Sequence, residues 1–155
     1  MSVRTFARTF VALWYLLGWL SHVYLAIFST ETYRVFGNTA LIPGFAKLWQ
    51  TLVMPNIVVL ALALAGFEVL VGGLLASQGR WVKLGLTLSL LFNLFLVQLG
   101  LGYAAPSPAN DFMVNRLPNL VFMCLQVPLL WGHDSRSLMV ILREWWSATW
   151  HPVKS

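Results

Sequence analysis

An apolar run from Leu52 to Ser77 constrains the fold of this chain more than any other feature. A helix crosses a bilayer with about 20 mainly apolar residues. This run is longer than that and contains a single charged side chain, Glu68. Charged residues make up only 10% of the chain, against roughly 25% in soluble globular domains. So few charges cannot cover a water-facing surface, and the sequence therefore predicts an integral membrane protein.

Three further segments are apolar and long enough to cross a membrane. The first of these segments resembles a signal peptide, because two basic residues, Arg4 and Arg8, precede its apolar core. It is longer than such a core, however, and lacks a small-residue cleavage site. We therefore expect it to remain as a membrane helix. The prediction is an all-α integral membrane fold, a four-transmembrane-helix bundle within residues 1–134, with helices at about 5–28, 52–77, 81–103 and 115–131.

Two shorter segments are expected to lie in the membrane interface. Phe45–Trp49, in the long loop before the second helix, is rich in aromatic residues, which favour the headgroup level and predict a short interfacial helix. Residues 135–155 alternate apolar and charged side chains, a pattern typical of an amphipathic helix on the membrane surface. Pro55 is expected in the first turn of the second helix, and Pro128 is expected to kink or unwind the end of the fourth.

The basic residues predict the orientation in the membrane. Cytoplasmic loops carry an excess of Lys and Arg, and the expected topology divides these residues unequally. We therefore expect both termini in the cytoplasm and a multi-pass protein of the inner (cytoplasmic) membrane. The net charge of +5 then reflects orientation and contact with anionic membrane lipid, and nucleic acid is not an expected partner. One side holds Arg4, Arg8, Arg80, Lys83, Arg136, Arg143 and Lys154, and the other holds Arg34, Lys47 and Arg116.

Polar side chains inside the apolar segments mark the candidate site, because a buried polar group is costly in hydrocarbon and needs a partner. At about 1.5 Å of rise per residue, they form two sets by depth. Near the bilayer centre lie Glu68, Asn93 and Gln126, and nearer the outer side lie His22, Gln98 and Asn119. Since Asn119 and Gln126 share one helix face, we expect a polar seam that runs from the bundle centre to the outer side.

Two interpretations of this seam remain open. In the functional one, Glu68 is a catalytic proton acceptor, His22 is its partner, and the amide side chains contact a quinone or another substrate. In the structural one, Glu68 forms a hydrogen bond with Asn93 or Gln126 and fixes the helix register. His22 could also ligate a haem or chlorophyll-type metal. A quinone is the candidate cofactor, and no metal-ligand pair occurs at a working spacing.

Several function classes are not supported by the residues present. The chain has one cysteine, Cys124, so it has neither an internal disulfide nor a Cys-x-x-Cys redox pair. We expect Cys124 to be a small core residue. There is no phosphate-binding glycine loop and no Ser/His/Asp set, which argues against a nucleotide enzyme or a hydrolase.

The sequence Phe-Glu-Val-Leu-Val-Gly-Gly-Leu-Leu at 67–75, followed by Gly79-Arg80 and at once by a third helix, resembles the DoxX-like (DoxX/DoxD) four-helix membrane proteins. The resemblance covers the second and third helices and the four-span plan. It implies a bundle in a bacterial or archaeal cytoplasmic membrane. Relatives in the DoxD branch are linked to thiosulfate:quinone oxidoreduction, and others to redox maturation or stress complexes.

Only Glu68, Gly72 and Gly73 can be carried over from that family by position. The aromatic first loop and the Trp-rich tail depart from its pattern and suggest a surface for another protein. The leading hypothesis is a DoxX-like protein of a redox or quinone-linked membrane system, with a quinone that enters between helices toward Glu68 and His22. Glu68 would move the proton, and His22 would bind a quinone oxygen. The alternative is a non-catalytic accessory subunit of a larger respiratory or photosynthetic complex, whose partners are other membrane-protein subunits. A small transporter is a third class.

Overall fold

The computed structural model describes residues 2–150, and every regular element in this range is a helix. Four helical stretches are long and apolar enough to cross a membrane, which confirms the expected all-α, four-span organisation. They are α1 (Val3–Phe28), the stretch Phe45–Ala76 that ends in α3 (Ile57–Ala76), α4 (Arg80–Leu99), and the stretch Pro108–Trp131 that contains α6 (Leu117–Gln126).

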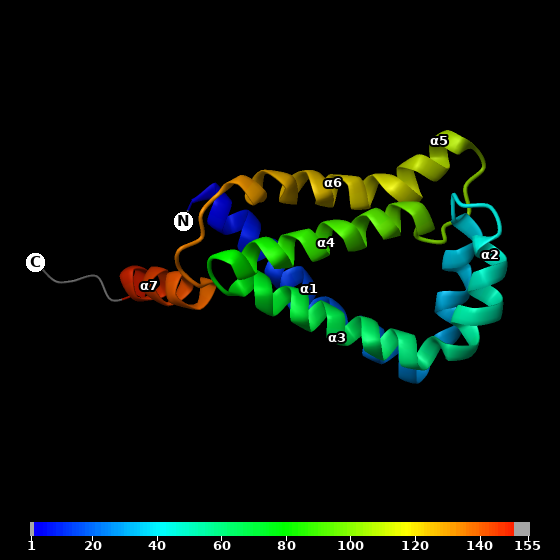
Figure 1. Ribbon diagram of the computed structural model, residues 1–155, viewed down its shortest axis with the longest axis horizontal. Coiled ribbons are helices and arrows are strands. Elements are labelled where there is room, and N and C mark those ends of the chain that lie inside the picture. Colours follow the sequence, from blue (N-terminus) through cyan, green and yellow to red (C-terminus); the bar gives the residue numbers. More distant parts are fainter. Residues whose placement is uncertain (1, 151–155) are drawn as a thin grey trace, which may run out of the picture.

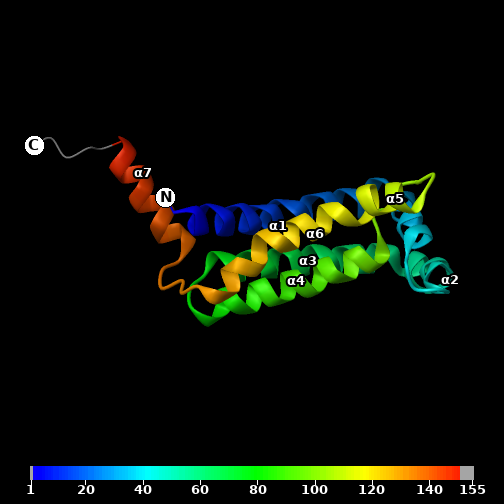
Figure 2. The same cartoon turned by 90° about the horizontal axis from the view of Figure 1, so that it is seen from above.

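The four spans form an elongated bundle (Figure 1, Figure 2). α1 packs along α3, α3 packs on α4, and α4 packs on α6, whereas α1 approaches α6 over a short stretch only. One end, here the amino end, holds the start of α1, the α3–α4 turn and α7 (Leu138–Trp150). The other end, here the loop end, holds the 3-10 helix η1 (Thr30–Thr39), α2 (Phe45–Leu48) and α5 (Pro108–Asp111).

Glycines set the closest helix contacts in the bundle. A Cβ on Gly72 would lie 2.6 Å from Leu16 Cγ and 3.1 Å from the Leu16 backbone nitrogen, so only glycine allows α3 to lie this close to α1. Gly66 and Gly73 face open space, since a Cβ at either position would have no atom within 4 Å. Of the three glycines around Glu68, Gly72 alone has the packing role that small residues have in membrane helices.

A buried arginine ties the amino end together. The side chain of Arg8 is 2% exposed and forms an ion pair with Asp134, with 3.2 Å between Nη1 and Oδ1. Its Nε donates to the carbonyl of Leu75 at 2.8 Å, and its Nη2 donates to the carbonyl of Ser77. Since the last carbonyls of a helix have no partner inside it, Arg8 satisfies the end of α3. Arg4 adds a second ion pair to Asp134 at 2.5 Å.

The loop end has a comparable centre in Arg116 and Asn115, both buried. Arg116 pairs with Asp111 at 3.2 Å, and it donates to the carbonyls of Val97 and Thr39. Asn115 Oδ1 accepts from the backbone N–H of Tyr103 at 2.9 Å. These bonds fix the chain between α4 and α6, where α4 stops.

The helical stretch of the second span begins at Phe45, earlier than expected, and continues to Ala76. Figure 1 shows its first part, labelled α2, across the loop end and at an angle to α3, and the interfacial placement of Phe45–Trp49 stays a prediction. Pro55 lies at the start of η3 (Met54–Asn56), directly before α3. The π-helical turn η2 (Trp49–Val53) and the 3-10 turn η3 interrupt the α-helical bonding at that point, which accommodates a residue without an N–H.

The other boundaries differ for local reasons. α4 ends at Leu99 rather than at 103 because Gly100 and Gly102 adopt φ values of +80° and +79°, in the left-handed region that ends a helix. The fourth span begins at Pro108 rather than at 115. The predicted effect of Pro128 is confirmed, since Val127–Trp131 is a 3-10 helix, η5. Cys124 is exposed on α6, so its expected place in the core is wrong.

The tail forms α7, which extends from the amino end away from the bundle (Figure 1, Figure 2). Its first turns pack on the bundle, where Leu138 is buried and Leu142 contacts the core. The placement of this helix at a membrane surface stays a prediction. Residues 151–155, with His151 and Lys154, lie outside the described part of the chain.

Candidate functional site

The candidate site is built around Glu68, which α3 directs toward α1 and which is only 6% exposed. A Cβ added to Gly18 of α1 would lie 3.1 Å from Glu68 Oε2 and 3.3 Å from Oε1. The carboxyl group therefore lies directly against the backbone of α1, in a space that a glycine leaves. One turn further along α1, His22 Nε2 lies 3.4 Å from Glu68 Oε1, within ion-pair distance.

His22 is oriented by a residue of the loop end. Its Nδ1 lies 2.7 Å from the Tyr33 hydroxyl oxygen, and the two rings are stacked with centroids 6.0 Å apart. Trp49 Nε1 donates to the Tyr33 carbonyl at 2.8 Å, which holds η1 against the second span. Burial, with a smaller effect from the charge of Glu68, raises the pKa of Tyr33 to about 12. Tyr33 is therefore a neutral phenol at physiological pH and can donate its proton to Nδ1.

This contact decides the tautomer of a neutral His22. When Nδ1 accepts from Tyr33, the imidazole proton must lie on Nε2, the nitrogen that faces Glu68. The order Tyr33–His22–Glu68 thus directs an N–H toward Oε1 and leaves Oε2 for another partner. Tyr33 connects this acid to the loop end of the bundle.

A second polar cluster lies deeper, between α1, α4 and α6. Ser89 donates to Gln126 Oε1 at 2.5 Å and lies 2.8 Å from the Tyr15 hydroxyl oxygen. Because Ser89 has one hydroxyl proton and Gln126 Oε1 can only accept, Tyr15 is the donor in its contact with Ser89. Asn93 Nδ2 donates to the Tyr15 oxygen at 3.0 Å and to the Ser89 carbonyl at 2.8 Å. The cluster is a closed brace across three helices.

A cavity of about 490 Å³ separates these two sets of groups and lies toward the loop end. Its volume is within the range of roughly 300–1,000 Å³ that small-molecule sites occupy. Its wall is mainly apolar, with a few polar side chains. The polar ones are Tyr15, Ser21, His22, Tyr33, Glu68, Asn93 and Asn119, and the other aromatic ones are Trp14, Phe36, Trp49, Phe92, Phe95 and Phe122.

Two polar atoms of this wall have no partner. Glu68 Oε2 and Asn119 Nδ2 are fully buried from solvent and form no hydrogen bond within the described chain. Their residues are 6% and 8% exposed. A buried polar atom without a partner costs roughly 1–3 kcal/mol, and more when it is charged. Both residues line the cavity, so its wall holds one acceptor and one donor without a partner among the described residues.

The structure brings together four of the six residues singled out from the sequence: Glu68, His22, Asn93 and Asn119 line one cavity. Gln126 lies behind Asn93 in the brace. Gln98 does not line the cavity, although its Nε2 is also buried without a partner among the described residues. The expected hydrogen bond from Glu68 to Asn93 or Gln126 does not occur within the described chain, because those amides bond within the brace instead.

Sequence reasoning did not identify Tyr15, Tyr33 or Gly18. Tyr15 resembles an interface anchor in an aromatic helix, and Tyr33 stands in a segment expected to be a loop. The sequence signals for the brace are the common depth of Asn93 and Gln126 and the spacing of Ser89 and Asn93, four residues apart on one helix face. Among residues 2–150, no group of three or more His, Cys, Asp or Glu is placed to hold a metal ion. Both ring nitrogens of His22 already face protein groups, Tyr33 and Glu68.

Comparisons with protein-family models, with curated proteins and with solved structures find no match to this chain. Any function must therefore be inferred from the cavity and its residues. The resemblance of 67–80 to DoxX-like proteins stays a prediction.

Proposed function

We propose that this chain is a multi-pass membrane protein that binds a quinone-type ring in the cavity beside Glu68, as part of a redox or quinone-linked membrane system of the DoxX-like kind. The observation that carries the proposal is the pair of buried, unpartnered atoms, Glu68 Oε2 and Asn119 Nδ2, in an aromatic-walled cavity of about 490 Å³. A quinol offers what both atoms lack, a hydroxyl donor and an oxygen acceptor on one planar ring.

The wall supports a planar aromatic ligand. Phe122 of α6 lies 5.5 Å from Trp14 and 6.3 Å from Tyr15 of α1, between ring centroids, and Phe92 lies 5.3 Å from Phe67. Aromatic rings at such distances favour offset or edge-to-face contacts with a further ring. A ligand with a charged or strongly hydrated headgroup would find too few polar partners here.

In this proposal Glu68 is the proton acceptor of the site. The proton leaves a ligand hydroxyl, whose O–H bond breaks, and forms an O–H bond with Oε2. The N–H of His22 faces Oε1, and Tyr33 holds His22 in that tautomer, so the contact positions the carboxyl group and leaves Oε2 for the ligand. His22 therefore positions Glu68 rather than contacting the quinone itself. The proposal assigns ligand binding and proton acceptance to this chain and no electron transfer.

The orientation of the site follows from the basic residues. Most of them belong to segments at the amino end, which we place on the cytoplasmic side of an inner membrane. The loop end, with Tyr33, then faces the outer side. The proton accepted by Glu68 would exchange with that side along Tyr33 and His22.

The binding proposal is tested by calorimetric titration of the purified protein in detergent with a short-chain benzoquinol. Hydrogen bonds to charged groups contribute about 1.5–3 kcal/mol, so we expect Glu68→Gln to weaken binding by roughly 10- to 100-fold. Asn119→Leu should weaken it by a smaller factor, because its bond is neutral. Glu31→Gln is the matched control, since the Glu31 side chain is 72% exposed at the loop end. Equal affinity in all four proteins, or no binding to the unmodified chain, would reject the proposal.

One observation favours a second function, that of an accessory subunit. α7 extends from the bundle and exposes large apolar side chains, with Met139 77% and Val140 38% exposed. A chain that ends after Ser137 should lose any membrane subunits that co-purify with the full chain, whereas Glu68→Gln should retain them. Retention of the same subunits without α7 would remove the support for this second function.

A further inference from the structure

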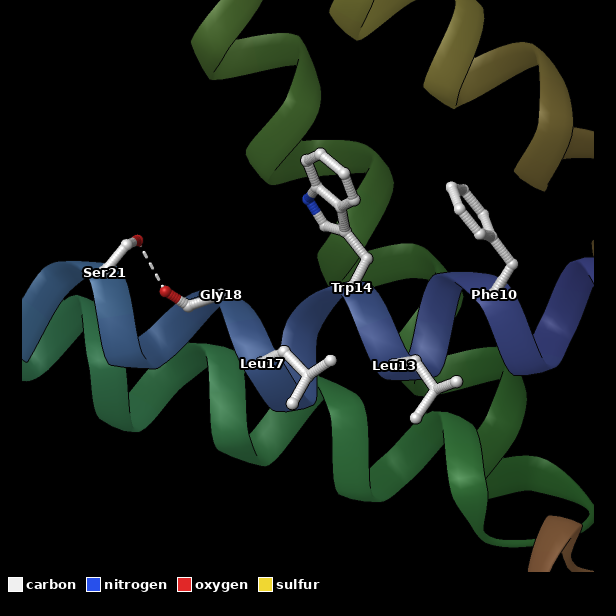
Figure 3. A pocket seen from close by; sticks show the side chains of 6 residues that line it. All are labelled: Phe10, Leu13, Trp14, Leu17, Gly18 and Ser21. Carbon is white, nitrogen blue, oxygen red and sulfur yellow. Dashed lines mark hydrogen bonds between the residues drawn. The ribbon is translucent and has the colours of Figure 1, made fainter.

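A second hollow lies on the lipid-facing side of α1, next to the cavity. It is an open groove of about 460 Å³, lined by Phe10, Leu13, Trp14, Leu17, Gly18 and Ser21 (Figure 3). Figure 3 shows Phe10 and Trp14 on one side of α1 and Leu13 and Leu17 on the other. At Gly18 no side chain stands between the two rows.

The groove is continuous with the cavity. Trp14, Gly18 and Ser21 line both hollows. Gly18 is also the residue whose missing Cβ leaves space for the Glu68 carboxyl group. The three shared residues of α1 therefore join the lipid-facing groove to the cavity that Glu68 lines.

The wall of the groove suits a hydrocarbon chain. Four of its residues are large and apolar, and the Ser21 hydroxyl already donates to the Gly18 carbonyl at 2.6 Å. The indole N–H of Trp14 is the one side-chain donor of the groove that forms no hydrogen bond within the described chain, so a polar headgroup would find few partners here. The groove extends from Ser21 to Phe10, roughly 16 Å along the helix axis, which is also the direction of a lipid chain in a bilayer.

We infer that the ligand of the cavity is an amphipathic lipid quinone whose ring lies beside Glu68 and whose hydrocarbon tail leaves between α1 and α6 to lie in the groove over Leu13 and Leu17. This inference depends on the proposed binding of a quinone ring in the cavity. It adds the ligand class, a tailed membrane quinone rather than a small water-soluble one, and the route of entry from the lipid phase.

The test compares one ring with and without a tail, 2,3-dimethoxy-5-methyl-1,4-benzoquinone and decylubiquinone, both kept in the reduced quinol form and titrated at a fixed detergent concentration. Leu17→Trp fills the groove without touching the cavity, since Leu17 lines the groove only and is 60% exposed. Leu13→Trp is a second groove variant. Ile27→Trp is the control, on the same helix and 65% exposed but outside both hollows. The control carries the same added indole, so detergent partitioning of the ligands is unchanged.

We expect both groove variants to lower the affinity for decylubiquinone by about tenfold relative to the control, as for the loss of a few methylene contacts. The affinity for the tail-less ring should stay unchanged. If the tailed ligand binds equally well to Leu17→Trp and Ile27→Trp, the tail inference is wrong, while Glu68-dependent binding of the ring would still stand. If the ring does not bind to the unmodified chain, the proposed function fails and the inference fails with it. Loss of bound phospholipid alone would assign the groove to a bilayer lipid and overturn the inference.

Discussion

Substitution of Gly18 by alanine tests how closely the function depends on the contact between α1 and Glu68. The added Cβ would lie 3.1 Å from Oε2, 3.3 Å from Oε1 and 3.4 Å from Cδ of Glu68. All three distances are at or below ordinary van der Waals contact, so the carboxyl group must move by a few tenths of an ångström. Its only close partner, His22 Nε2, is already 3.4 Å away. A small shift is therefore enough to misalign Oε2 with a ligand hydroxyl.

We expect Gly18→Ala to change the affinity for the ligand clearly and the free energy of unfolding only slightly. Alanine is favoured over glycine inside a helix by about 1 kcal/mol, which offsets part of the cost of about 1–3 kcal/mol for crowding a packed site. The free energy of unfolding should therefore change by less than about 2 kcal/mol. A ligand hydrogen bond to Glu68 contributes about 1.5–3 kcal/mol, and its partial loss predicts a roughly 5- to 20-fold weaker affinity for the benzoquinol.

The assay is the same calorimetric titration, together with thermal unfolding in detergent. Gly73→Ala is the matched control, because it adds the same methyl group to a membrane helix where nothing lies within 4 Å. Unchanged affinity in Gly18→Ala would refute the close coupling of α1 to the acid. Equal losses in Gly18→Ala and Gly73→Ala would show that the effect is not local to Glu68.

Three further predictions address the parts that support the site. Arg8→Met should lower the free energy of unfolding by about 3–5 kcal/mol, because it breaks a buried ion pair, and denaturation in mixed micelles measures this. Gly72→Ala should destabilise by about 1–3 kcal/mol in the same assay, since its Cβ would lie 2.6 Å from Leu16 Cγ. The Tyr33 phenol should titrate at about 12 by ultraviolet absorbance, and Glu68→Gln should lower that midpoint, although burial is the larger cause. Between pH 10 and 12 the unfolded chain has lost the Tyr33 proton and the folded chain keeps it, so stability should fall as pH rises through this range.

The segments that cross the membrane could be predicted because their signal is local. Apolar length and the absence of charge decide whether a segment leaves water, and both are properties of a single stretch of sequence. The residues at which the helices begin and end were harder to predict from the sequence. Gly100 and Gly102 stop α4 through their backbone conformation, whereas the helical stretch that leads into α3 begins at Phe45, ahead of the π and 3-10 turns around Pro55.

The polar residues show where sequence reasoning reaches its limit. Depth along each helix placed Glu68, Asn93 and Gln126 at one level, but depth does not say which way a side chain turns around the helix axis. That rotation depends on which helices touch, and α3 presents Glu68 to α1 rather than to α4 or α6. Asn93 and Gln126 consequently bond with Tyr15 and Ser89 instead of with Glu68.

The sequence by itself determined that this chain enters a membrane with four helices and that a single acid lies in the middle of one of them. Only the tertiary structure decided what that acid faces: a glycine of α1, a histidine held by Tyr33, and a cavity with an unpartnered amide from α6. The physical reason is that hydrophobic transfer depends on the composition of one segment, whereas a site depends on the relative rotation of several helices, which close packing at Gly18 and Gly72 sets.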